Sequence, residues 1–190
     1  MANPACLTGV LLVGGASRRY GAPKALAQLD GETLAERAWR VLGELGGERL
    51  AVGKTVDGLE LPFPLVDDGS DVRAPLSGLV AGLRAATHEL VVFLPVDMPL
   101  VDATALHALA AACRDAAVPP TGPLPGAYRR TILPVLEARH LAGELRLSDA
   151  LADLDTAVVP LDPTVLANVN EPADLQRLLG RPRTRARPEP

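Results

Sequence analysis

A glycine-rich loop with three basic side chains is the strongest chemical signal in this sequence. From residue 14 to residue 24 it reads Gly-Gly-Ala-Ser-Arg-Arg-Tyr-Gly-Ala-Pro-Lys, directly after an apolar stretch. Its glycines let backbone amides approach a phosphate without interference from a Cβ atom, and successive amides can form an anion-binding concavity. Arg18, Arg19 and Lys24 supply positive charge. The loop therefore predicts a site for a phosphate-rich ligand, and the alternative is a surface turn with incidental arginines.

Two common phosphate motifs do not fit this loop. A Walker loop requires Gly-Lys-Ser/Thr, whereas Lys24 follows Pro23 and precedes Ala25. The dinucleotide fingerprint requires Gly-x-Gly-x-x-Gly, and the glycine spacing here differs. The loop must bind its ligand in another way.

Two aspartates follow stretches that are predicted to be buried strands. Asp97 comes after residues 90–95, and Asp68 comes after residues 65–66 and beside Asp67. Ligands of open α/β sheets bind outside the carboxyl ends of the strands, and Mg²⁺ favours one or two carboxylates together with substrate phosphates. Asp97 is therefore a candidate magnesium ligand and Asp68 a second site candidate. Turn or helix-capping roles are the alternatives for both.

The elements that must position these residues alternate between strands and helices. Strands are predicted at 7–13, 49–52, 65–66, 90–95 and 157–159, and helices at 34–45, 76–86, 104–113 and 174–179. Residues 119–125 are predicted to be a linker or a loop over the site, and 130–136 and 141–154 to be strand and helical material. This alternation predicts an α/β fold with a mostly parallel sheet and helices on both faces.

The length and composition fit one domain. The chain has 190 residues, of which 48% are hydrophobic, and this is enough for one continuous core. We predict a single domain over residues 1–180. Residues 181–190 are rich in arginine and proline and cannot contribute to a core, so we predict a disordered tail.

The net charge and the lack of long apolar stretches argue against binding to nucleic acid or to membranes. The formal net charge of −4 gives no overall attraction to nucleic acid or to an anionic membrane. No apolar stretch approaches the ~20 residues that span a bilayer. Cys6 and Cys113 lack the spacing of a metal site and are interpreted as buried thiols in a reducing compartment. We therefore expect a cytoplasmic protein that binds neither nucleic acid nor membranes.

Six segments, in order along the chain, resemble the motifs of the MobA-like nucleotidyltransferases. They are Gly14–Lys24, Val66–Asp68, Ala74–Gly78, Leu94–Pro99, Pro123–Arg130 and Asn168–Leu175. The resemblance spans about residues 7–180 and is greatest to the molybdenum cofactor guanylyltransferases, which transfer GMP from GTP to molybdopterin. It implies a three-layer α/β/α Rossmann-like sandwich of the nucleotide-diphospho-sugar transferase type.

The resemblance also implies roles for individual residues. The implied nucleotide-binding residues are Leu12, Val13, Gly14, Gly15, Lys24, Asp68, Pro75, Leu76, Gly78 and Asp97. The implied catalytic residues are Arg19, Lys24 and Asp97, with Mg²⁺ as the cofactor held by Asp97. Asn168 and Asn170 would face the acceptor. The implied partners are GTP or another nucleoside triphosphate, a phosphorylated pterin, and other proteins of cofactor biosynthesis.

The sequence departs from the family at four places. Tyr20 replaces a usual methionine or phenylalanine, Pro23 a frequent aspartate and Ala74 a frequent glycine, and residues 51–54 lack an asparagine that is common there. Three interpretations therefore stay open. They are a guanylyltransferase, a related enzyme such as a cytidylyltransferase for the same pterin, and a nucleotide-binding regulator without activity.

The expected reaction requires no nucleophilic side chain. The second pKa of a terminal phosphate is about 6, so an acceptor phosphate is largely ionised near neutral pH and can attack a phosphorus atom directly. Catalysis of this kind consists of positioning and charge neutralisation. We accordingly expect no catalytic role for His88, His107 or His140.

Overall fold

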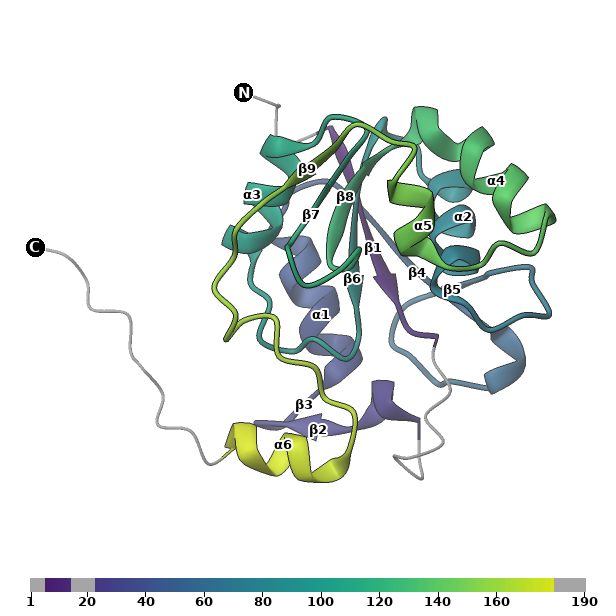
Figure 1. Cartoon of the computed structure of the whole chain (residues 1–190). Coiled ribbons are helices and arrows are strands. Elements are labelled where there is room, and N and C mark those ends of the chain that lie inside the picture. The colour runs from purple at the N-terminus through teal and green to yellow at the C-terminus, as the bar shows by residue number, and fades with distance from the viewer. Residues whose placement is uncertain (1–5, 15–22, 180–190) are drawn as a thin grey trace, which may run out of the picture.

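A seven-stranded sheet forms the centre of the computed structural model, which describes residues 6–14 and 23–179 (Figure 1). Its spatial order is β5-β4-β1-β6-β8-β7-β9. The strands are β1 (Leu7–Leu12), β4 (Glu48–Gly53), β5 (Leu65–Asp67), β6 (Leu90–Pro95), β7 (Ala116–Val118), β8 (Gly126–Arg129) and β9 (Thr156–Val158). A separate two-stranded ribbon joins β2 (Gln28–Leu29) and β3 (Glu32–Thr33).

The sheet is mostly parallel, as predicted. β1 pairs in parallel with β4 and β6, β4 with β5, and β7 with β9. β8 runs antiparallel to both of its neighbours. After β1 the chain adds β4 and β5 on one side and then returns to place β6 on the other side. This reversal creates a switch point at the carboxyl ends of β1 and β6, which is where open α/β sheets bind ligands.

Helices cover both faces of the sheet and give three layers (Figure 1). The α-helices are α1 (Leu34–Gly43), α2 (Pro75–Ala85), α3 (Ala103–Ala112), α4 (Leu133–Leu141), α5 (Leu147–Leu151) and α6 (Pro172–Leu179). Short 3₁₀ helices within the described residues are η1 (Lys24–Leu26), η2 (Thr55–Asp57) and η3 (Arg130–Ile132). Side chains of α1, α3 and α6 belong to one buried cluster, and those of α2, α4 and α5 belong to the other. The predicted sandwich is therefore confirmed.

Alternating side chains of the central strands supply both clusters. On β1, Leu11 packs in the cluster of α1 and α3, whereas Val10 packs in the cluster of α2. On β6, Leu94 packs in the cluster of α1 and α3, and Phe93 packs in the cluster of α2. Successive side chains of a strand point to opposite faces, so a strand with helices on both sides must be apolar throughout. This explains the continuous apolar stretches in the sequence.

The sequence-based prediction was least accurate between residues 116 and 141. Strands β7 and β8 were not predicted, and residues 130–136, where strand was expected, form η3 and the beginning of α4. β8 is short and contains glycine and alanine, so it carries no periodic signal. Its place is set by tertiary contacts, since Tyr128 is fully buried and its hydroxyl donates to the carbonyl oxygen of Pro123 at 2.5 Å.

The two cysteines differ from each other. Cys113 is buried, as predicted, and burial raises the pKa of its thiol to about 11. Cys6 is exposed, contrary to the prediction, because it precedes the first buried residue of β1.

The predicted tail, residues 181–190, lies outside the described residues. None of the described helices is long and apolar enough to cross a membrane.

A reciprocal cap starts α1 beside the segment that carries Lys24. Thr33 Oγ1 accepts from the Glu36 backbone amide at 3.1 Å, and the Glu36 carboxylate accepts from the Thr33 amide at 2.9 Å. Hydrogen bonds from Thr33 hold the pKa of Glu36 below its usual value. The Leu34 amide then donates to the carbonyl oxygen of Ala27 at 2.9 Å. The cap therefore ties the start of the helix to the chain that follows η1.

We expect Thr33→Ala to lower the free energy of unfolding by about 1 kcal/mol, because it removes the side-chain acceptor of this cap. Thr33→Ser is the matched control, since it keeps the hydroxyl group. Urea unfolding followed by circular dichroism measures both variants. Equal stabilities for the alanine and serine variants would contradict the role of the cap.

Candidate functional site

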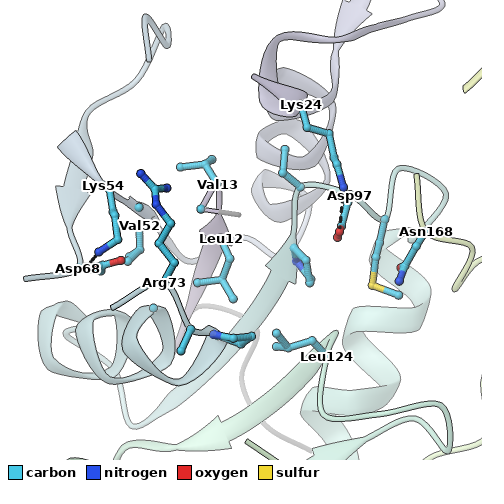
Figure 2. Close-up of a pocket in the computed structure, with 18 residues that line it drawn as sticks. Leu12, Val13, Lys24, Val52, Lys54, Asp68, Arg73, Asp97, Leu124 and Asn168 are labelled. Atoms are coloured by element: carbon cyan, nitrogen blue, oxygen red, sulfur yellow. Dashed lines mark hydrogen bonds and ion pairs between the residues drawn. The ribbon is translucent and has the colours of Figure 1, made fainter. Parts of the chain in front are cut away.

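A cavity of about 500 Å³ opens at the carboxyl edge of the sheet (Figure 2). Its walls come from the ends of β1, β4 and β6, from the start of α2, and from the loops that follow these strands. Figure 2 shows Lys54 and Asp68 at one end, Lys24 and Asp97 at the other, and Leu12 and Val13 between them. The cavity therefore lies at the switch point of the sheet, where the topology predicts a ligand.

Backbone pairing fixes the wall between the two ends. The Val13 amide donates to the carbonyl oxygen of Val52, and the Val96 amide donates to that of Leu12, both at 3.0 Å. Two glycines permit close packing here. A Cβ atom on Gly53 would lie 2.7 Å from Val13 Cγ2, and a Cβ atom on Gly78 would lie 2.9 Å from Leu12 Cδ2. A larger residue at either position would have to displace a side chain of this wall.

One end of the cavity brings together a cation, a carboxylate and an amide. Lys24 Nζ lies 3.4 Å from Asp97 Oδ2 and 3.4 Å from Asn170 Oδ1. The Val169 amide donates to the carbonyl oxygen of Asp97 at 2.7 Å. This bond holds the loop with Asn168, which lines the cavity, beside the end of β6. The Asp97 side chain is 30% exposed, so its carboxylate can exchange partners with a ligand.

The other end contains a buried ion pair. Lys54 Nζ donates to Asp68 Oδ1 at 2.9 Å, and the two side chains are only 9% and 8% exposed. The ammonium also donates to the carbonyl oxygen of Ser70. The Ser70 amide in turn donates to Asp68 Oδ1 at 3.0 Å. Lys54 and Asp68 follow β4 and β5, so adjacent parallel strands place them side by side.

The adjacent aspartates 67 and 68 have different surroundings. Asp68 lines the cavity, whereas Asp67 is exposed and accepts hydrogen bonds from the Thr55 hydroxyl, the Thr55 amide and the Gly69 amide. These bonds, with the Thr55 hydroxyl as the largest cause, lower the pKa of Asp67 to about 2. Only one of two successive strand residues can face the cavity. Asp67 therefore fixes η2 and Asp68 faces the site.

A third cation lies at the mouth of the cavity. Arg73 lines it and forms a two-nitrogen ion pair with Asp57, in which Nη1 donates to Oδ2 at 2.8 Å. The guanidinium holds the pKa of Asp57 below its usual value. Among the described residues of the cavity wall, Lys24, Lys54 and Arg73 thus each have a carboxylate partner.

Most of the predicted site residues gather around this cavity. Those that line it are Leu12, Val13, Gly14, Lys24, Asp68, Pro75, Gly78, Asp97 and Asn168. Asn170 does not line it but contacts Lys24. Leu76 is fully buried against the sheet and does not line the cavity, because Pro75 and Gly78 occupy the exposed side of this turn of α2. Gly15 and Arg19 lie outside the described residues.

Sequence reasoning missed several cavity residues, of which Lys54 and Arg73 are the charged ones. A signal for Lys54 was present in the sequence. It follows a strand that was predicted at 49–52, and the ends of parallel strands meet at one edge of the sheet. Arg73 lies in a loop, where periodicity gives no information. Its position depends on the ion pair with Asp57.

The residues at the Asp97 end fit a magnesium ion that arrives with phosphates. Among residues 6–14 and 23–179 there is no cluster of three or more histidine, cysteine or acidic side chains that could hold a metal alone. Mg²⁺ is usually bound by one or two carboxylates plus substrate phosphates. The partly exposed carboxylate of Asp97, already facing a cation, meets that requirement. Asp97 is thus the residue that would hold the ion.

Known proteins resemble this chain in sequence and in fold. The pattern of the MobA-like NTP transferase domain matches residues 9–158. A molybdenum cofactor guanylyltransferase from Pseudomonas putida is 34% identical over 189 residues, covering 92% of this chain and 98% of the relative. A probable molybdenum cofactor guanylyltransferase from Carboxydothermus hydrogenoformans is 30% identical over 187 residues, covering 91% of this chain and 95% of the relative.

A solved structure shares the fold. Molybdopterin-guanine dinucleotide biosynthesis protein A from Archaeoglobus fulgidus superimposes with a TM-score of 0.77 at 25% sequence identity. The match covers 90% of this chain and 95% of the other chain. The similarity therefore extends over nearly all of the sheet and its helices.

We expect overpacking in Gly78→Ala to cost about 1–3 kcal/mol, because the new methyl group must displace Leu12 from the cavity wall, against a gain of about 0.5–1 kcal/mol from alanine in a helix. Leu12→Val removes the Cδ2 atom that this methyl group would meet. In the Leu12→Val background, the effect of Gly78→Ala should therefore be smaller. A double-mutant cycle of unfolding free energies measures this coupling. Equal effects in both backgrounds would contradict the close contact.

Proposed function

This chain belongs to the MobA-like NTP transferase family, and on that premise we propose that it transfers GMP from GTP to molybdopterin with release of pyrophosphate. The similarity over nearly the whole length to molybdenum cofactor guanylyltransferases supports this choice within the family. We further propose that the reaction uses Mg²⁺. In this proposal the phosphates and Mg²⁺ bind at the Asp97 end of the cavity, and the base binds at the Lys54 end.

The single observation that carries the proposal is the division of the cavity into two charged ends. Lys24 and Asp97 form one end, beyond β6, and Lys54 and Asp68 form the other, beyond β4 and β5. Three strand spacings separate β5 from β6, which is about 14 Å at the usual ~4.8 Å per spacing. Leu12 and Val13 give the middle an apolar wall. An extended nucleotide fits this arrangement, with phosphates at the Asp97 end and the base at the Lys54 end.

The proposed reaction exchanges one phosphoanhydride bond for another. An oxygen of the acceptor phosphate attacks the α-phosphorus of GTP, and the bond from that phosphorus to the β-phosphate oxygen breaks. Pyrophosphate carries away the electron pair. Because the acceptor phosphate is already ionised near neutral pH, no side chain must remove a proton. The barrier is the approach of two anions, so the task of the protein is to neutralise charge and align the groups.

Lys24 and Asp97 are suited to that task. The ammonium of Lys24 now pairs with Asp97 at 3.4 Å, a long contact that phosphate oxygens can replace. Asp97 would then hold Mg²⁺, which when bound supplies charge neutralisation and orientation of the phosphates. Asn168 and Asn170 lie beside this end, so the acceptor would approach from their side. Arg19, which lies outside the described residues, would add a second cation.

We expect GTP with Mg²⁺ to raise the melting temperature more than ATP, CTP or UTP does. A ligand at a hundred times its Kd stabilises the folded state by about 2.7 kcal/mol. For a domain of this size that corresponds to roughly 5 to 10 °C. A thermal shift assay measures all four nucleotides. A shift with CTP alone would instead favour a cytidylyltransferase, and no shift with any nucleotide would contradict a nucleotide site.

We expect Asp97→Asn to reduce pyrophosphate release in the presence of acceptor by at least about a hundredfold, because loss of one charged group at a reacting phosphate has effects of this size. The matched control is Asp155→Asn, which removes a carboxylate from an exposed ion pair with Arg114 far from the cavity. The control should retain the wild-type rate. Full activity of Asp97→Asn, with unchanged folding, would contradict the assignment.

A further inference from the structure

Lys54 is a buried charged residue, whose side chain is only 9% exposed. Lysine is almost never buried unless it is paired. Burying an ion pair removes two charges from water, and an apolar pair of similar size is often equally stable. The pair of Lys54 and Asp68 also lines a cavity instead of filling the core. Its position suggests a role in recognising what enters the cavity.

The hydrogen bonds at this pair leave one donor and one acceptor for a ligand. An ammonium group has three N–H donors. Lys54 uses one for Asp68 Oδ1 and one for the carbonyl oxygen of Ser70, and the described residues offer no partner for the third. Asp68 Oδ1 accepts from Lys54 and from the Ser70 amide, whereas Oδ2 has no hydrogen-bond donor among the described residues. The cavity thus presents an ammonium donor beside a carboxylate acceptor.

We propose that Lys54 is a base-specificity residue, which donates to the 6-carbonyl oxygen of guanine while Asp68 Oδ2 accepts from the neighbouring N1–H. This inference rests on the proposed use of GTP. Guanine presents an exocyclic acceptor beside a ring donor, which complements the pair. Adenine has the opposite order in the same orientation, with an exocyclic amino donor beside a ring acceptor. The amino group would then face the ammonium and the ring nitrogen would face the carboxylate.

The surroundings make this discrimination strong. Hydrogen bonds to charged groups contribute more than those between neutral groups, and both side chains are shielded from water. A site built to hydrogen-bond a substrate group rejects analogues that lack it, because its own polar groups are then left unpaired. Ser70 holds both partners, through its carbonyl oxygen and its amide, so the pair is already oriented before a base arrives.

The test compares three nucleotides, each with Mg²⁺, by equilibrium binding to the wild-type chain and to Lys54→Met. The nucleotides are GTP, the triphosphate of 2-aminopurine riboside, which lacks both the 6-carbonyl oxygen and the N1–H, and ITP, which keeps both and lacks the 2-amino group. Wild type should bind GTP at least about a hundredfold more tightly than the 2-aminopurine nucleotide. In Lys54→Met this ratio should fall at least about tenfold, while the ratio of GTP to ITP stays unchanged. Arg84→Met, which removes an exposed cation paired with Glu137, should change neither ratio.

The outcomes separate this inference from the proposed function. If Lys54 neither contacted the base nor oriented Asp68, Lys54→Met would weaken all three nucleotides by one factor, and unchanged ratios would overturn the inference. A wild-type chain that binds GTP and the 2-aminopurine nucleotide within threefold would overturn it without any variant, even if Lys54→Met does not fold. Preference of the wild type for CTP over GTP would instead overturn the proposed function.

Discussion

The pairing of β1 with β4 on one side and β6 on the other brings both charged ends of the cavity to one edge of the sheet. Leu12 lies opposite Val52 in one pair and opposite Pro95 in the other, so the three strands end at the same level. The chain that follows each strand must then turn outward at one edge. Lys54 and Asp97, which are far apart in the sequence, become two ends of one cavity for this reason.

The chain has a net negative charge, so the cations at this edge must provide the attraction for an anionic ligand. Each of these cations that the structure describes is paired with a carboxylate. The pairs differ in exposure, and this difference separates their functions. The contact between Lys24 and Asp97 is long and partly exposed, so incoming phosphates can replace it at modest cost. The pair of Lys54 and Asp68 is short and buried, so it stays intact and presents a fixed pattern of donor and acceptor. One end can therefore rearrange while the other discriminates.

The sequence alone predicted the parallel core, because buried strands and amphipathic helices have clear periodicities. Much of the cavity wall was predicted through the resemblance to the MobA-like motifs. Sequence reasoning failed at β8, where Gly126, Ala127 and buried Tyr128 are placed by tertiary contacts. It placed Leu76 in the nucleotide site by motif, whereas the geometry of α2 turns that side chain into the core. It gave Lys54 no role in the site, although it predicted the strand that precedes this residue. The pairing of Lys54 with Asp68 depends on the adjacency of β4 and β5, which local sequence does not encode.

A crystal structure of the complex with GTP and Mg²⁺ tests the central claim most directly, because it locates both ends of the nucleotide at once. The account predicts the guanine ring between Leu12 and the start of α2, with its 6-carbonyl oxygen on Lys54 and its N1–H on Asp68. It predicts the phosphates beside Lys24, with the metal ion on Asp97. A nucleotide bound in the reverse direction, or outside this cavity, would contradict the account.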